Sequence, residues 1–416
     1  MYRVWDYVST YSLLLIAGAA LALVWVNTDP AAYGAFVHQV IAVNPFVGDL
    51  QGEGGDQVRE LTVGYLVNDM LMAFFFAIAA KEVWEAVALE SGSLRGRRAL
   101  TPLIATAGGM IGPAVVYLSL AAWLGVTGAT WRGWAIPTAT DIAFSYLVGR
   151  VVFGARHPAV RFLLLLAIAD DAGGLAILAV FYPAGPILPG WLALSFGAAV
   201  TVYALFNWLP RRLDGSDPLR PVSTRVRRRL SFWPYAAAGA ASWYGFQQSG
   251  IHPALGLLPI IPAIPHADRG FGVFAEAEAH LKDLLNTIEH GLKIPVEIVL
   301  FFFGLVNAGV EIAAAGAPTA LVAFGLLVGK PAGIVLFGLA AVRILGLGLP
   351  KGMDVRDLVV LGFVAAIGFT VALFVASVAF PAGAVQDAAK MGALLSLSAA
   401  VIAVAAGRLL GIKRAE

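Results

Sequence analysis

The chain is built from long apolar runs that are separated by short charged or Pro/Gly-rich breaks. Apolar residues make up 59% of the 416 residues and charged residues only 13%, about half the charged share usual in soluble domains. An apolar helix of about 20 residues spans the hydrocarbon core of a bilayer. The composition therefore excludes a soluble enzyme and predicts an all-α polytopic membrane protein.

Twelve of these apolar runs are candidate transmembrane helices. They cover residues 11–27, 62–85, 100–124, 134–152, 160–182, 188–208, 231–248, 251–265, 294–315, 318–345, 357–380 and 388–410. The first run is expected to be an uncleaved span. The run 251–265 is the weakest candidate because it is short and carries four prolines. Without it the two termini would lie on opposite sides of the membrane.

The distribution of Lys and Arg predicts the orientation of the chain. With twelve spans, 24 of the 28 basic residues fall on the side that also holds both termini. The other side holds only Arg59, Arg132 and Lys390, and Lys330 lies inside a span. Cytoplasmic loops are enriched in Lys and Arg. Both termini are therefore predicted to be cytoplasmic.

We expect a single transmembrane transporter domain over residues 1–416 with three polar segments. Residues 44–60 are predicted to form a hairpin outside the cytoplasm. Residues 209–230 form a basic cytoplasmic loop with seven Arg, which either sets the topology or binds anionic lipid. Residues 266–292 form a polar cytoplasmic segment that is expected to carry a surface helix.

Five charged residues fall deep within the predicted spans, away from the span ends: Asp69, Asp141, Asp170, Asp171 and Lys330. A charge at the centre of a bilayer costs at least about 2.5–3.5 kcal/mol, so such residues face protein or water and usually serve function. They are therefore the leading candidates for the functional site.

The adjacent carboxylates Asp170 and Asp171 have about ten apolar residues on either side. Neighbouring helix residues point about 100° apart, so the two carboxylates cannot face one target equally. Lys330 is the only basic residue at comparable depth and is predicted to pair with one of them. A static ion pair between two helices would explain one Asp and leave the other unexplained.

Carboxylate oxygens at this depth suit both sodium and protons. Hard cations prefer oxygen ligands, and a buried carboxylate also accepts a proton. Two carboxylates can hold two protons or one sodium ion, but hardly both. This exclusion is sufficient for an antiporter site.

The fourth run contains Pro137 followed by Thr138-Ala139-Thr140-Asp141, residue types that interrupt a helix. This pattern predicts either a broken membrane helix, with Thr140 facing the cation and Asp141 capping a half-helix, or an ordinary proline kink. A second interruption occurs in the eleventh run at Gly368-Phe369-Thr370. Paired interruptions are typical of transporters with inverted repeats.

Eight ordered segments carry a resemblance to the NhaA-type bacterial sodium/proton antiporter family. They read VNDMLMAFFF, GGMIGPAVVYL, GWAIPTATDIAF, LAIADDAGGLAILAVFY, SGIHPALG, FGLVNAGV, GLLVGKPAGI and AAIGFTVALFVASVAF. The resemblance implies about twelve transmembrane helices with inverted repeats, in which the fourth and eleventh are broken and cross.

The resemblance also implies roles for the intramembrane residues. Asp171 would bind and exchange the cation, while Asp170 would bind it or pair with Lys330. Thr140 and Asp141 match the broken fourth helix, where Asp141 would balance the dipoles of facing half-helices. The accessory carboxylate of the second helix is matched by Asp69.

Members of this family are gated by pH, and four residues match their ionisable positions: Glu82, Glu289, His290 and, on the opposite side, His252. His290 is chemically suited because the unperturbed histidine pKa lies near neutrality. The chain departs from the family at Trp84-Glu85, which replace a usual basic pair, at Lys81, and at Lys293. These changes affect the expected pH threshold rather than the ion site.

The expected function is electrogenic, pH-dependent export of sodium and lithium in exchange for protons, with no cofactor, organic substrate or nucleic acid. Membrane lipid and a second copy bound through the hairpin are the expected partners. A sodium-coupled symporter, another cation/proton exchanger and a channel remain alternatives. The sequence speaks against an intramembrane prenyltransferase or aspartyl protease, since it lacks a DDxxD motif and a Gly-x-Gly-Asp segment.

Overall fold

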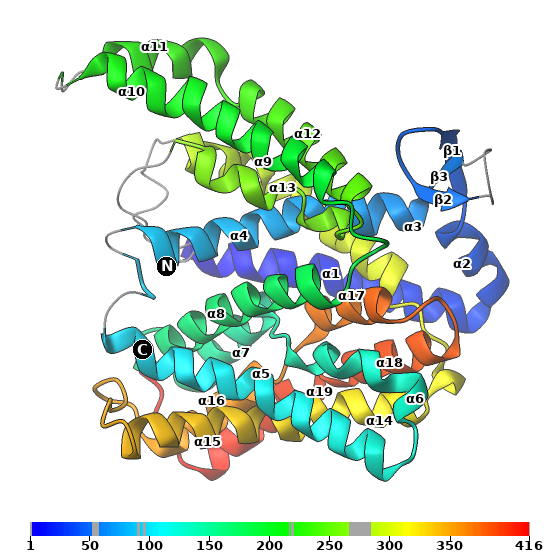
Figure 1. The fold of residues 1–416 in the computed structure, drawn as a ribbon. Coiled ribbons are helices and arrows are strands. Elements are labelled where there is room, and N and C mark those ends of the chain that lie inside the picture. Colours follow the sequence, from blue (N-terminus) through cyan, green and yellow to red (C-terminus); the bar gives the residue numbers. More distant parts are fainter. Residues whose placement is uncertain are drawn as a thin grey trace. The chain divides into compact units, whose positions relative to one another are not determined.

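The computed structural model describes residues 2–51, 58–89, 92–94, 97–215, 217, 220–265 and 284–415, and these are mostly helical (Figure 1). Within them, six apolar helices are long enough to cross a bilayer, namely Val63–Ala88, Ala99–Trp123, Pro158–Phe181, Pro189–Asp214, Ala317–Arg343 and Ala384–Leu409. The bent pair Val355–Ala365 and Phe369–Ala379 adds a seventh candidate span. Every one of the twelve predicted runs coincides with helical segments, which confirms the predicted fold class.

The chain divides into two compact units that alternate along the sequence. The first unit comprises His38–Gly92 and Leu178–Val299. The second comprises Tyr2–Val37, Ser93–Ile177 and Leu300–Glu416. Two helices, α8 (Pro158–Phe181) and α13 (Leu284–Asn307), run from one unit into the other. That the whole chain acts as a single transporter domain stays a prediction.

The first unit contains a small sheet and several helices. Its elements are β1 (Val40–Asn44), β2 (Asp49–Gln51), β3 (Val58–Thr62), α3 (Val63–Tyr65), η1 (Leu66–Leu71), α4 (Met72–Ala88), α9 (Pro189–Tyr203), η3 (Ala204–Trp208), α10 (Leu209–Asp214), α11 (Pro221–Leu230), α12 (Trp233–Ser249), η4 (Pro253–Leu255) and η5 (Leu258–Ala263). The elements η1 and η3 are π-helical turns, whereas η4 and η5 are short 3₁₀ helices. The prolines of the run 251–265 explain why it forms short 3₁₀ turns instead of a long α-helix.

The predicted hairpin is present and is larger than the sequence indicates. Its strands form an antiparallel sheet in the order β1-β3-β2, which extends from Val40 to Thr62. The Arg59 guanidinium on β3 donates to the Gly48 carbonyl at 2.8 Å and to Gln248 Oε1 at 2.9 Å. Arg59 therefore ties the sheet to the last turn of α12.

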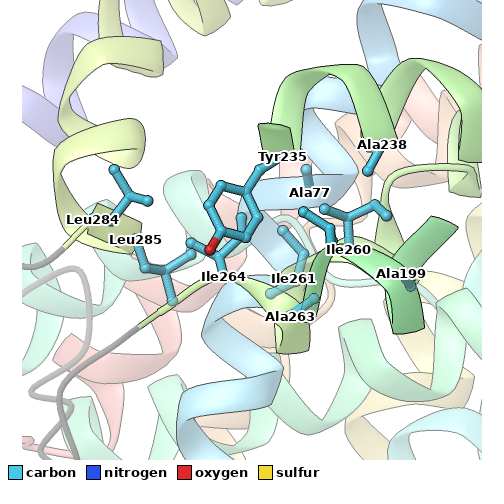
Figure 2. Packing of buried hydrophobic residues seen from close by; sticks show 11 residues of the cluster. Ala77, Ala199, Tyr235, Ala238, Ile260, Ile261, Ala263, Ile264, Leu284 and Leu285 are labelled. Carbon is cyan, nitrogen blue, oxygen red and sulfur yellow. The ribbon is translucent and has the colours of Figure 1, made fainter. Parts of the chain in front are cut away.

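Small and branched apolar side chains form the packed core of the first unit (Figure 2). Ala77 on α4 and Tyr235 on α12 meet Ile260 and Ile261 on η5 and Leu285 on α13. Small residues allow helices in a membrane protein to approach closely. This packing holds the short proline-rich turns between longer helices.

The basic segment 209–230 is more ordered than predicted, because it contains α10 and α11. The Asp214 carboxylate accepts the backbone N–H groups of Val222 and Ser223 at 2.6 and 3.0 Å, and also the Ser223 hydroxyl. These bonds satisfy the first N–H groups of α11, which have no partner within the helix.

The polar segment 266–292 differs from its prediction in one respect. Residues 266–283, where a surface helix is predicted, lie outside the described residues. From residue 284 onward the segment already belongs to α13, which ends at Asn307. The apolar part of α13, Ile294–Asn307, begins where the predicted span 294–315 begins, and it ends eight residues earlier.

The second unit contains the remaining helices. They are α1 (Tyr2–Thr28), α2 (Pro30–Val37), α5 (Arg97–Trp123), α6 (Thr127–Thr130), η2 (Trp131–Thr138), α7 (Ile142–Phe153), η7 (Ile312–Ala314), α14 (Ala317–Phe324), η8 (Gly325–Gly329), α15 (Lys330–Arg343), α16 (Val355–Ala365), α17 (Phe369–Ala379), α18 (Ala384–Leu395) and α19 (Ser398–Leu409), together with most of α8. The packing of α5 against α15 is the most extensive helix contact in this unit.

Both predicted helix interruptions are present in the second unit. The fourth span consists of the 3₁₀ helix η2, an extended Ala139-Thr140-Asp141 segment, and α7. The extended backbone shows that the alternative of an ordinary proline kink is wrong. In the eleventh span, α16 and α17 are bent by 49° at the break between Ala365 and Phe369. The inverted repeat itself stays a prediction.

Candidate ion-binding site

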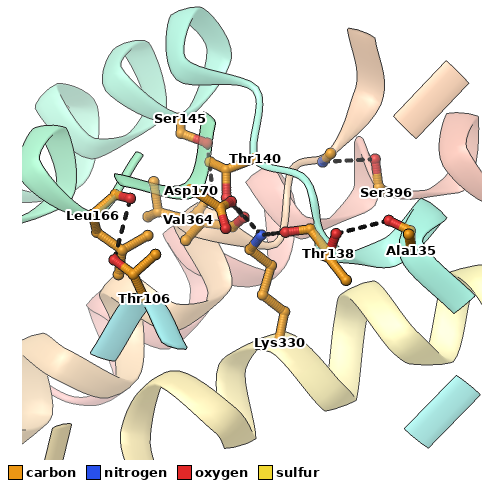
Figure 3. Close-up of polar contacts among 12 residues, drawn as sticks. Thr106, Ala135, Thr138, Thr140, Ser145, Leu166, Asp170, Lys330, Val364 and Ser396 are labelled. Atoms are coloured by element: carbon orange, nitrogen blue, oxygen red, sulfur yellow. Dashed lines mark hydrogen bonds and ion pairs between the residues drawn. The ribbon is translucent and has the colours of Figure 1, made fainter. Parts of the chain in front are cut away.

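A buried ion pair joins α8 to α15 in the second unit (Figure 3). The Lys330 Nζ atom lies 2.7 Å from Asp170 Oδ2, and the exposed fractions of the two residues are 0% and 3%. Lys330 also donates to the carbonyl of Thr138, at the end of η2. The predicted pairing of Lys330 with one of the two adjacent carboxylates is therefore present, and it involves Asp170.

The second Asp170 oxygen is available for a further ligand. Oδ1 is buried near Thr140 and has no hydrogen-bond partner of good geometry among the described residues. A buried carboxylate oxygen without a partner is costly, which favours a proton or a cation at this position. Asp171, the next residue on α8, is only partly buried and interacts electrostatically with Lys330.

Thr140 presents its oxygen lone pairs at the break in the fourth span. Its hydroxyl donates to the Ala365 carbonyl at 3.0 Å, where α16 ends. Because this bond uses the hydroxyl hydrogen, the oxygen is left as an acceptor. Thr140 Oγ1 and the Asp170 carboxylate are oxygen ligands of the kind that hard cations prefer.

Asp141 connects the two broken spans. Its Oδ1 accepts the Phe144 N–H at 3.2 Å and so caps α7, while its Oδ2 accepts the N–H of Thr370 at 3.2 Å and the Thr370 hydroxyl. Its own N–H donates to the Ile367 carbonyl at 2.7 Å. Both oxygens are occupied by donors from two helix N-termini, an arrangement that stabilises a negative charge. This geometry makes Asp141 the link between the first turns of α7 and α17.

The sequence interpretation does not include three further polar residues near the two helix breaks, Thr370, Ser145 and Ser396. Thr370 belongs to the interrupted motif but was not among the predicted site residues. Ser145 donates to the Val364 carbonyl at 2.9 Å, and the Gly368 N–H donates to Ser396 Oγ at 3.2 Å. All three satisfy backbone or carboxylate groups at the breaks. Their signal in the sequence is an isolated hydroxyl residue within an apolar run.

Asp69 and His252 lie together in the first unit. Asp69 is on the π-helical turn η1, and its Oδ1 is 3.7 Å from Nδ1 of His252, the N-cap residue of η4. The indole N–H of Trp243 donates to the Asp69 carbonyl at 2.8 Å. The accessory carboxylate and the histidine, predicted separately, therefore form one cluster.

Glu82 is part of a charged cluster on α4. Lys81 is 2% exposed, and its Nζ lies 3.0 Å from a Glu85 oxygen and 3.5 Å from a Glu82 oxygen. Two of the residues that depart from the family pattern, Lys81 and Glu85, thus interact with each other, and Lys81 also contacts Glu82. Glu289 and His290 lie on α13, but their side chains are outside the described part of the structure.

Comparison with known proteins identifies the family. The sequence model of the Na+/H+ antiporter 1 family matches residues 3–408. The chain belongs to this family.

Curated relatives of the antiporter family cover nearly the whole chain. The Na(+)/H(+) antiporter NhaA of Jannaschia sp. (strain CCS1) is 65% identical over 419 residues and covers 100% of both chains. The NhaA antiporter of Geobacter sulfurreducens is 44% identical and covers 97% of both chains. The one from Desulfitobacterium hafniense (strain DCB-2) is also 44% identical and covers 99% of this chain and 97% of its own. Family membership and the apolar helices establish a multi-pass membrane protein of a transporter family.

Proposed function

We propose that this protein exports sodium, and also lithium, from the cytoplasm in exchange for protons that enter down their gradient. The observation that carries the proposal is the buried Lys330–Asp170 pair, which lies beside the break of the fourth span. Among the described residues it leaves one Asp170 oxygen without a well-formed hydrogen bond. Membership of the sodium/proton antiporter family supports the same activity.

Competition at one site accounts for the exchange. When Asp170 and Asp171 are ionised, their oxygens and Thr140 Oγ1 bind sodium, and the Lys330–Asp170 pair separates. When the carboxylates take up protons, their attraction for the cation is lost and sodium leaves. Asp141 holds the two broken helices together, because both of its oxygens accept hydrogen bonds from their first turns.

Transport is proposed to alternate the exposure of this site between the two sides of the membrane, as in transporters with midplane sites. If two protons enter for each sodium ion that leaves, each cycle moves one net charge. The membrane potential then supplies about 2.3 kcal/mol per 100 mV for that charge. The proposed exchange is therefore electrogenic.

Regulation by pH is proposed for the ionisable residues outside the ion site. Glu82 shares Lys81 with Glu85, so protonation of either carboxylate changes the charge balance of this cluster. The Asp69–His252 cluster also contains two ionisable side chains. Glu289 and His290 are proposed to act with Glu82 at the cytoplasmic side.

A homodimer in the bacterial inner membrane, with both termini in the cytoplasm, is the proposed assembly. The small sheet exposes apolar side chains at Val40, Ile41, Val43, Phe46 and Leu50, which are 43–62% exposed. Exposed apolar residues grouped on a small sheet are typical of an interaction surface. Membrane lipid is the other proposed partner, with no cofactor, organic substrate or nucleic acid.

Purified protein in sealed vesicles tests the proposed exchange. A pH-sensitive dye reports a proton gradient, and adding sodium or lithium should collapse it without any organic substrate. A symporter would require an organic substrate, and a channel would pass sodium without proton movement. Parallel additions of potassium distinguish a sodium-selective antiporter from a general cation/proton exchanger.

A further inference from the structure

The backbone around Lys330 is held by a close crossing of α5 and α15 in the second unit. A Cβ atom placed on Gly108 of α5 would lie 2.2 Å from the Gly333 carbonyl oxygen, and one on Gly112 would lie 2.4 Å from the Gly329 carbonyl oxygen. Real Cβ atoms do not approach backbone this closely, so α5 and α15 touch through their main chains on both sides of Lys330. The Cα atom of Lys330 therefore has little room to move.

Helix α8, which carries the Asp170 and Asp171 carboxylates, has no such close backbone contact at its two central glycines. Gly173 and Gly174 follow Asp170 and Asp171 directly, in the middle of α8. A Cβ atom on Gly174 would meet no described atom within 4 Å, and one on Gly173 would meet only the end of the Met110 side chain. No close backbone contact explains either glycine.

Glycine in a helix interior is unfavourable relative to alanine, because its backbone loses more conformational freedom on folding. Glycine pairs are also among the places where helices bend. In an α-helix the N–H groups of residues 173 and 174 bond the carbonyls of residues 169 and 170. Flexing at Gly173-Gly174 therefore acts on the turn that carries Asp170.

We infer that Gly173 and Gly174 are positioning residues that let α8 flex, so that the Asp170 and Asp171 carboxylates move while Lys330 stays in place. This inference rests on the proposed function, in which the Lys330–Asp170 pair separates once in each cycle. Lys330 is held on α15 by the glycine crossing and is also bonded to the Thr138 carbonyl. Of the two paired residues, Asp170 on α8 therefore has the less constrained backbone.

Gly174→Ala in the full-length protein tests the inference, because the added methyl group fits without a clash. The maximal exchange rate in vesicles should fall at least threefold, while the sodium concentration for half-maximal rate and the pH profile stay unchanged. The melting temperature should rise. Gly197→Ala in α9 is the matched control, since Gly197 also has no described atom within 4 Å of its Cβ position and lies outside the site. That variant should gain stability with an unchanged rate.

Hydrogen–deuterium exchange gives a second readout that does not depend on transport. Amides of residues 172–178 should exchange faster than those of residues 162–169 in the wild type, and Gly174→Ala should remove the difference. A wild-type maximal rate in Gly174→Ala, an equal loss of rate in Gly197→Ala, or uniform exchange along wild-type α8 would each overturn the inference. Absence of sodium/proton exchange in the wild type would instead reject the proposed function, and the deuterium data would still decide whether α8 flexes.

Discussion

Thr370 donates both its backbone N–H and its hydroxyl to one carboxylate oxygen of Asp141, 229 residues away in the sequence. Asp141 is also the N-cap of α7. One carboxylate therefore accepts hydrogen bonds from the first turns of two helices, α7 and α17, each of which follows an interruption within its span. Hydrogen bonds to ionised acceptors are stronger than neutral ones. This contact fixes the crossing next to which Lys330 and Asp170 meet.

Thr370→Val should destabilise the crossing, because it removes the hydroxyl donor but keeps the N–H donor and the shape of the side chain. The free energy of unfolding should fall by about 1.5–3 kcal/mol, the usual value of a hydrogen bond to a charged group. Thermal melting in detergent measures the loss. Thr370→Ser keeps the hydroxyl and should melt close to the wild type. Equal melting temperatures for the valine and serine variants would show that the hydroxyl contributes nothing.

Lys330→Ala should leave the Asp170 carboxylate buried without its cation. Breaking a buried pair by removing one partner costs about 3–5 kcal/mol, so melting should occur at clearly lower temperature. The pH profile of exchange should move toward alkaline pH, because a carboxylate without a neighbouring cation holds its proton more tightly. The double variant Asp170→Asn with Lys330→Met should recover much of the stability. A single variant with unchanged melting and pH profile would mean that the pair is not formed in the membrane.

Thr140→Val should weaken sodium binding, because it replaces the hydroxyl oxygen with a methyl group of similar size. Loss of one ligand oxygen is expected to raise the half-saturating sodium concentration about tenfold, equivalent to about 1.4 kcal/mol. The sodium dependence of exchange in vesicles measures this change, with Thr140→Ser as the control that keeps the oxygen. The assignment of Thr140 as a ligand fails if the valine and serine variants share one sodium dependence.

Lys81→Met should lower stability in a pH-dependent way. Without the ammonium group, the buried Glu85 and half-buried Glu82 carboxylates each lose their contact with the Lys81 cation on α4. Ionised carboxylates are destabilised by this loss, whereas protonated ones are not, so the deficit should be large above neutral pH and shrink as the pH falls. Thermal melting of variant and wild type between pH 5 and 8.5 tests this. A deficit that is constant with pH would indicate a packing effect of the substitution.

Much of the fold follows from the sequence because the bilayer sets a strong constraint. Apolar runs of spanning length predict the helices, and the Thr140-Asp141 and Gly368-Thr370 interruptions predict the breaks. The exact form of the breaks does not follow in the same way. The segment before Thr140 is a 3₁₀ helix, because tertiary packing and local hydrogen bonds decide such details.

The residues of the candidate site are likewise only partly predictable from the sequence. Charge at membrane depth identifies Asp170 and Lys330, because only a paired or functional charge is tolerated there. The side chains that form hydrogen bonds with the backbone at the two helix breaks are harder to predict from the sequence. Ser145 and Ser396 are ordinary residues within apolar runs, and only the fold brings them to the Val364 carbonyl and the Gly368 N–H.

The most direct test of the proposed exchange site is the sodium-driven collapse of a pH gradient in vesicles that contain Asp171→Asn. This substitution keeps the size of the side chain and removes the carboxylate that the proposal assigns to cation and proton exchange. The variant should melt near the wild-type temperature, and adding sodium should leave its gradient intact while the wild type collapses it. Substantial sodium-dependent proton flux in the folded variant would contradict the account.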